Sequence, residues 1–266
     1  MRDIVIQTGC KTLRFLKNVG NITQLLINTY ISLLHLQKRG LKSNIKVVID
    51  QIRFTGVAAL PLVSVLALLL GGTAIIQATT YLPKIGASSY IGNVITLVII
   101  RELGPLITAL IVIGRSGTAI ATELCSMKIN HEIDALEIMG IDPYQFIIIP
   151  RLIGVTISLL CLIVCFDTIA IIGGYVVACL KMNLLFTTFI SGLHNAITLT
   201  DLVLSGIKGG LFGFIIATFG CYEGLSIKGS PTEIPQAATK IVVRSILIIF
   251  MIDTLFAFIF YLSEGI

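Results

Sequence analysis

Charged side chains inside apolar stretches are the residues of this sequence most able to do chemistry. Arg101 and Glu102 lie about a third of the way into one long apolar stretch, and Lys208 lies at a similar depth in a later one. A charge at the centre of a bilayer costs about 2.5–3.5 kcal/mol on insertion scales, so such residues tend to face a bundle interior or a wet cavity. We therefore expect a Glu102–Lys208 pair across the bundle, and expect Arg101, Glu102 and Lys208 to line a cavity that receives a polar headgroup. The alternative is that the pair is structural and locks two helices.

A second group of charges, all acidic, lies between two apolar stretches. Its members are Glu132, Asp134, Glu137 and Asp142. An apolar stripe runs beside them at steps of four and three residues, through Ile129, Ile133 and Leu136. Asn130 can cap a helix here, and Gly140 and Pro143 can end it. The pattern predicts an amphipathic helix over about 131–139, outside the membrane, where a basic partner can bind it. The alternative is a solvated loop helix.

The composition defines the environment of both groups. The chain of 266 residues is 56% hydrophobic and 12% charged, with a mean hydropathy of +0.99. Soluble domains carry about 25% charged residues, so this chain is predicted to be a polytopic membrane protein. Its six cysteines are scattered and imply no disulfide framework or metal site.

The apolar segments predict an all-α membrane protein with about five transmembrane helices, at about 55–79, 93–122, 146–180, 202–222 and 239–262. The segment 182–200 is dotted with polar residues and is expected to be an outer interfacial helix. If it spans the membrane instead, the chain has six spans. Residues 1–54 are predicted to form an N-terminal interfacial region with an amphipathic helix at about 10–35, followed by the membrane domain 55–262.

The distribution of basic residues predicts the orientation. The net charge is +5, and many Lys and Arg residues precede the first span. Cytoplasmic-side loops are enriched in such residues, so the N-terminus and the acidic helix are placed on the inner side. The same pattern favours contact with membranes and gives no reason to expect nucleic acid as a partner.

The stretch from Arg101 to Arg151 resembles the pattern of the MlaE/YrbE-type ABC transporter permeases. That pattern has a RELGP start, a GR.G turn, an acidic E.IDALE.MG.DP helix and a closing PR. The structural residues that match it are Gly104, Pro105, Gly114, Arg115, Gly117, Gly140, Pro143, Pro150 and Arg151. Flanking stretches beginning at Gln51 and Ile234 are also similar, so the resemblance covers roughly residues 45–262.

The resemblance implies a permease that moves phospholipids or related glycerolipids between membranes. It implies a homodimer that works with a separate ABC ATPase and an MCE-domain lipid-binding protein. The acidic helix would be the coupling helix, with Glu132, Asp134, Glu137 and Asp142 meeting the ATPase. The chain has no G-x-x-x-x-G-K-[ST] phosphate loop. No catalytic residue or cofactor is therefore expected in it, and ATP and Mg²⁺ would be used by the ATPase.

Two further expectations concern location and rival functions. The preference for Ile, Lys and Asn suggests an AT-rich genome. In this respect the chain is similar to a plastid-encoded permease, and the chloroplast lipid-import permease belongs to the same family. We expect the plastid inner envelope, with a bacterial or cyanobacterial inner membrane as the alternative. The rival functions are a secondary transporter, which needs inverted repeats or broken helices, and a non-transporting membrane scaffold.

Overall fold

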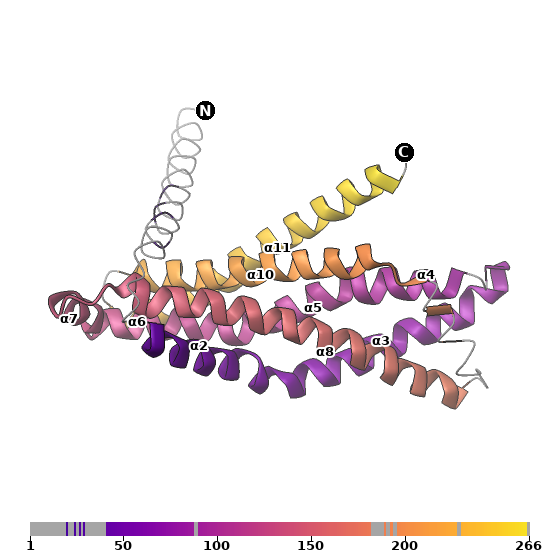
Figure 1. Cartoon of the computed structure of the whole chain (residues 1–266), viewed down its shortest axis with the longest axis horizontal. Coiled ribbons are helices and arrows are strands. Elements are labelled where there is room, and N and C mark those ends of the chain that lie inside the picture. Colours follow the sequence, from indigo (N-terminus) through magenta and orange to yellow (C-terminus); the bar gives the residue numbers. More distant parts are fainter. Residues whose placement is uncertain are drawn as a thin grey trace.

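The protein is an elongated bundle of helices whose long axes run in similar directions (Figure 1). The computed structural model describes residues 41–87, 90–181, 196–227 and 230–264, with isolated positions between 20 and 29 and between 189 and 193. Within these ranges the chain forms helices and no strand. The predicted all-α fold is thus confirmed, whereas the amphipathic helix expected at 10–35 lies almost wholly outside the described residues.

Five helical segments are long and apolar enough to cross a membrane, as the sequence predicts. They are Ile45–Ile85, Ile91–Ile129, Tyr144–Val176, Leu199–Leu225 and Pro231–Phe260. Large apolar side chains cover the outside of the bundle; Met251, for example, is 72% exposed. Such an apolar exterior suits lipid rather than water, so the chain is an integral membrane protein.

The first span is built from helices that follow one another almost without a break. They are α2 (Leu41–Thr55), the short 3₁₀ turn η1 (Val57–Ala59) and α3 (Leu60–Tyr81). A second 3₁₀ turn, η2 (Pro83–Ile85), follows. The boundary predicted at residue 54 falls within α2, and the domain division stays a prediction.

The second span contains two widened turns. It runs through α4 (Ile91–Ile95), the π-helix η4 (Thr96–Leu103), α5 (Gly104–Val112), the π-helix η5 (Ile113–Gly117) and α6 (Thr118–Ile129). The second of these widened turns, η5, contains Gly114 and Gly117. A π-turn holds an extra residue, so it shifts the faces on which neighbouring side chains project. The turn η4 carries Arg101 and Glu102.

The third span follows the short helix α7 (Glu132–Ile138) and is one long helix. The π-turn η6 (Tyr144–Ile148) leads directly into α8 (Ile149–Lys181). The 33 residues of α8 extend about 50 Å at 1.5 Å per residue, which exceeds the hydrocarbon thickness. This helix must tilt or project beyond the bilayer, as its sequence length suggests. Most of 182–200 lies outside the described residues, so its path stays a prediction.

The last two spans are α10 (Leu199–Leu225) and α11 (Ile234–Glu264), with the 3₁₀ turn η7 (Pro231–Glu233) between them. The fifth span was expected to begin near 239, but the helical segment begins at Pro231. Pro231 and Pro235 fall in first turns, where a missing N–H breaks no helical hydrogen bond. The prolines therefore start this helix instead of excluding it.

Helix α8 lies at the centre, in contact with α2, α3, α5 and α10. Its crossing with α3 depends on Gly71, where a Cβ atom would lie 2.5 Å from the backbone oxygen of Ala170. Helix α11 lies at the edge, and only 22% of the residues in its most apolar part are buried. It diverges from α10 toward the C-terminus (Figure 1).

Candidate functional site

Lys208 is the centre of a cluster of charges in the half of the bundle away from α7. Its ammonium group lies 3.1 Å from Glu102 Oε1 and 2.7 Å from Asp253 Oδ1. It also donates a hydrogen bond of 3.0 Å to the backbone oxygen of Arg101. The Lys208 side chain is 5% exposed, so its charge is compensated by the protein rather than by water. The predicted Glu102–Lys208 pair is present, with Asp253 as a further partner.

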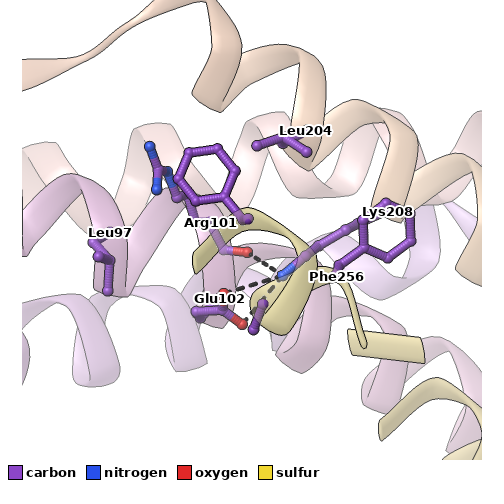
Figure 2. Close-up of a pocket in the computed structure, with 8 residues that line it drawn as sticks. Leu97, Arg101, Glu102, Leu204, Lys208 and Phe256 are labelled. Carbon is purple, nitrogen blue, oxygen red and sulfur yellow. Dashed lines mark hydrogen bonds and ion pairs between the residues drawn. The ribbon is translucent and has the colours of Figure 1, made fainter. Parts of the chain in front are cut away.

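Arg101 points away from Lys208, although it is next to Glu102 in sequence (Figure 2). Its guanidinium donates to the carboxylate of Asp201 and lies 3.9 Å from the ring centroid of Phe260. Asp201 also accepts hydrogen bonds from the backbone and hydroxyl of Thr198, which completes a capping box at the start of α10. The Arg101–Asp201 pair therefore holds η4 against the first turn of α10.

A cavity of about 210 Å³ opens beside these charges (Figure 2). The three residues expected to line it, Arg101, Glu102 and Lys208, all do so. Its other walls are apolar and come from η4, α10 and α11: Leu97, Leu204, Phe256, Ala257 and Phe260. Glu102 is 35% exposed at its side chain, and it is the carboxylate of the Lys208 cluster most open to a ligand.

Helix α7 lies at the opposite end of the bundle (Figure 1). Its acidic residues Glu132, Asp134 and Glu137 are all exposed, while Ile133 and Leu136 pack toward the core. Ile138 is 87% exposed and lies beside the acids. The helix thus presents carboxylates together with an apolar side chain, a combination suited to a protein partner.

The ends of α7 differ in part from expectation. Asn130 was expected to cap this helix, but it ends α6, and His131 occupies the N-cap position with a φ of 57°. His131 Nδ1 lies 2.7 Å from Asp134 Oδ2. Gly140, with a φ of 73°, ends the helix as predicted, because glycine adopts this conformation without strain. Asp142 accepts a hydrogen bond from the backbone N–H of Tyr144 at 2.9 Å.

Three other charged side chains have partners on other helices. Arg115 donates a hydrogen bond to the backbone oxygen of Phe54 at 2.9 Å. Glu123 pairs with Arg151 at 2.9 Å, and Glu223 pairs with Arg244. Each acid has a basic neighbour on another helix that sequence spacing does not reveal.

The motif residues occupy helix junctions rather than one site. Gly104 and Pro105 begin α5 and are buried, while Gly114, Arg115 and Gly117 form η5. Pro143 precedes η6, and Pro150 and Arg151 lie in the first turn of α8. A Cβ atom on Gly104 would lie 2.2 Å from Asp167 Oδ1, so this glycine admits the carboxylate of α8. The described residues hold no group of three His, Cys, Asp or Glu side chains placed to bind a metal.

Sequence reasoning missed Asp201 and Asp253 as the partners of Arg101 and Lys208. Both acids lie in the half of their helix away from α7, as Arg101 and Lys208 do, and this similar depth is a signal that the sequence offers. The T-x-x-D pattern of Thr198 to Asp201 also marks a helix start. Depth alone does not give the rotation of each helix, so it cannot show which acid meets which base.

These features define a helical membrane protein with a charged cavity toward one end and an exposed acidic helix at the other. Residues 48–259 match the family model described as Permease MlaE. The match covers most of the chain, and the chain belongs to this family of permeases.

Curated relatives from bacteria and a plant are similar over most of the chain. A "Probable ABC transporter permease protein" of Rickettsia typhi is 30% identical over 93% of this chain and 93% of its own length. "Intermembrane phospholipid transport system permease protein MlaE" of Haemophilus influenzae is 26% identical over 94% and 95%. "Protein TRIGALACTOSYLDIACYLGLYCEROL 1, chloroplastic" of Arabidopsis thaliana is 29% identical over 82% of this chain and 62% of its length.

Proposed function

We propose that this chain is the membrane subunit of an ABC transporter that moves phospholipids or related glycerolipids between membranes. The observation that carries the proposal is the cavity beside Lys208, where paired charges meet apolar walls and the lipid-facing edge of α11. The names of the relatives in Rickettsia typhi and Haemophilus influenzae support an ABC transporter and a phospholipid cargo.

The size of the cavity fits part of a lipid. Pockets for drug-sized ligands are about 300–1,000 Å³, so a space of about 210 Å³ holds a headgroup while the acyl chains remain outside. Three carboxylates, of Glu102, Asp201 and Asp253, face the two cations Arg101 and Lys208. A polar headgroup can exchange for one of these contacts, which offsets the cost of leaving water.

ATP hydrolysis belongs to a separate ATPase in this proposal, with α7 as its docking site. Closure of the ATPase would push on Glu132–Ile138 and move α6 and α8, which flank that helix. The π-turns η5 and η4 lie along the same span, so a displacement of α6 can reach Arg101 and Glu102. A few kcal/mol of differential binding is enough to shift such a two-state bundle.

The transport role is tested with purified transporter in proteoliposomes, using a fluorescent phospholipid and ATP. Glu102→Gln and Lys208→Met are expected to reduce lipid movement at least tenfold, which corresponds to about 1.4 kcal/mol of lost interaction. Asp167→Asn is the matched control, because it removes a carboxylate from α8 that does not line the cavity. Intact transport by both cavity variants in a stable protein would exclude this role.

The coupling role is tested by co-purification of the ATPase. Glu132→Lys and Glu137→Lys reverse exposed charges on α7 and are expected to abolish recovery of the partner. Lys84→Glu, an exposed reversal at the other end of the bundle, should leave recovery unchanged. Retention of the ATPase by both α7 variants would contradict this docking site.

The remaining partners and the location follow from the same proposal. A homodimer would place a second copy against the exposed face of α11 near the cavity, and an MCE-domain protein would receive lipid on the outer side. We infer a plastid inner envelope, because the printed name of the plant relative places that protein in the chloroplast; a bacterial or cyanobacterial inner membrane remains the alternative, since other relatives are bacterial. A secondary transporter would move lipid without an ATPase, and a scaffold would move none, so the proteoliposome assay separates all three functions.

A further inference from the structure

A second cavity lies at the end of the bundle that carries α7. It has a volume of about 490 Å³ and is enclosed by α2, α6, η6 and the first turn of α8. Its apolar walls include Phe54, Met127 and Phe146. Asp50, Glu123 and Arg151 supply its charges. None of these charged side chains belongs to the cluster around Lys208.

Arg151 is the unusual member of this cavity. Its side chain is only 8% exposed, and its Nη2 atom lies 2.9 Å from Glu123 Oε2. Its Nη1 atom is buried and has no hydrogen-bond partner among the described residues. A buried charged donor left without an acceptor is costly. The free half of the guanidinium therefore favours an acceptor brought in by a ligand.

The surroundings restrict the chemistry of that ligand. Guanidinium groups bind phosphate oxygens well, because their planar donors match the spacing of the oxygens. Glu123 is 61% exposed at its side chain and Asp50 is exposed, so two carboxylates stand at the opening. A bare anion would be repelled by them, whereas a ligand that pairs phosphate with an ammonium group satisfies both signs.

We propose that this cavity binds the zwitterionic headgroup of a phospholipid from the inner leaflet. The phosphate would accept from Arg151 Nη1, and the ammonium group would lie against Asp50 and Glu123. Phe54 and Phe146 would cover the glycerol and the first methylenes. The site is separate from the outer cavity and its occupation requires no transport, so it stands or falls independently of the transport cycle.

The absence of tryptophan from the sequence allows a clean reporter. Phe146→Trp places a single indole in the wall of the cavity. The full-length protein in detergent is titrated with short-chain phosphatidylethanolamine, with soluble phosphoethanolamine and with inorganic phosphate, and tryptophan emission is followed. We expect a saturable change with the lipid, and neither soluble probe should reproduce it at the same concentration.

Further substitutions in the reporter protein assign the contacts. Arg151→Lys retains a charge that can pair with Glu123 but loses the second donor, so it should weaken lipid binding about tenfold. Asp50→Asn, at an exposed position, should weaken it about threefold. Arg53→Lys is the control, since Arg53 is exposed on α2 and does not line the cavity.

Three outcomes would overturn the proposal. The first is an emission change that does not saturate, or one that Arg151→Lys leaves unaltered. The second is an equal response to phosphoethanolamine or phosphate, which would assign the cavity to a soluble anion. The third is loss of ATPase co-purification in Arg151→Lys without any lipid response, which would assign Arg151 to a protein contact.

Discussion

The charges around Lys208 and those on α7 show two ways of keeping ionised groups on a membrane protein. Around Lys208, side chains from η4, α10 and α11 satisfy one another inside the bundle, and Lys208 is 5% exposed. On α7 the contacts of Glu132 and Asp134 are local, to Asn130 and His131, and the side chains face outward. Interior charges can take a ligand only by exchanging partners, whereas the charges on α7 remain accessible to a partner.

This contrast predicts that the largest loss of stability follows from substitution of the buried Lys208. Lys208→Met leaves Glu102 and Asp253 without their shared cation, and removal of one member of a buried pair costs about 3–5 kcal/mol. Thermal unfolding in detergent should show a strongly lowered midpoint. Lys46→Met, at an exposed position on α2, is the control and should change little. Adding Glu102→Gln and Asp253→Asn should recover most of the stability, since no unpaired charge then remains. An unchanged midpoint in Lys208→Met would show that the cluster is solvated.

A second prediction tests what determines the loss of stability when one member of a charge pair is removed: the burial of the pair or its position along the bundle. Glu223 and Arg244 pair nearer the α7 end, and the Glu223 side chain is only 3% exposed. Arg244→Met should cost about 1–3 kcal/mol, because one buried carboxylate loses its partner. Lys46→Met removes an exposed charge on α2 and should be neutral. Equal midpoints for the two variants would mean that position along the bundle, not burial, governs these charges.

The third prediction concerns the charge pair that also caps a helix. Asp201→Ala removes the carboxylate that Arg101 contacts and the acceptor of the Thr198 hydrogen bonds. A lost cap costs about 0.5–2 kcal/mol, and Arg101 keeps its contact with Phe260. Hydrogen exchange should accelerate in the first turn of α10, with a small fall in the unfolding midpoint. Thr200→Ala, exposed in the same turn, should alter neither quantity.

The sequence predicts the helices better than the contacts between them. Hydropathy is a property of each segment, so the number and order of the five spans and the helix near 131–139 are confirmed, although the helical segments extend up to ten residues beyond the predicted ends. The Glu102–Lys208 pair was also predicted, because both residues lie at a similar depth. The partners Asp201 and Asp253 were missed, since the rotation of a helix depends on packing and on π-turns such as η4. The start of the fifth span was predicted too late, at about 239, because Pro231 begins the helical segment.

The smallest effect on stability is expected at α7, where the contrast predicts a large effect on binding instead. Glu132→Gln and Glu137→Gln remove exposed charges that contribute little to folding, so the unfolding free energy should change by no more than about 0.5 kcal/mol. If the partner surface is basic, ATPase recovery in the wild type should fall as salt rises, and the double variant should bind weakly at every salt concentration. Lys84→Gln is the control, because it removes an exposed charge from the other end of the bundle. A destabilised double variant with normal ATPase recovery would contradict this prediction, since the acids of α7 would then stabilise the fold and would not bind the partner.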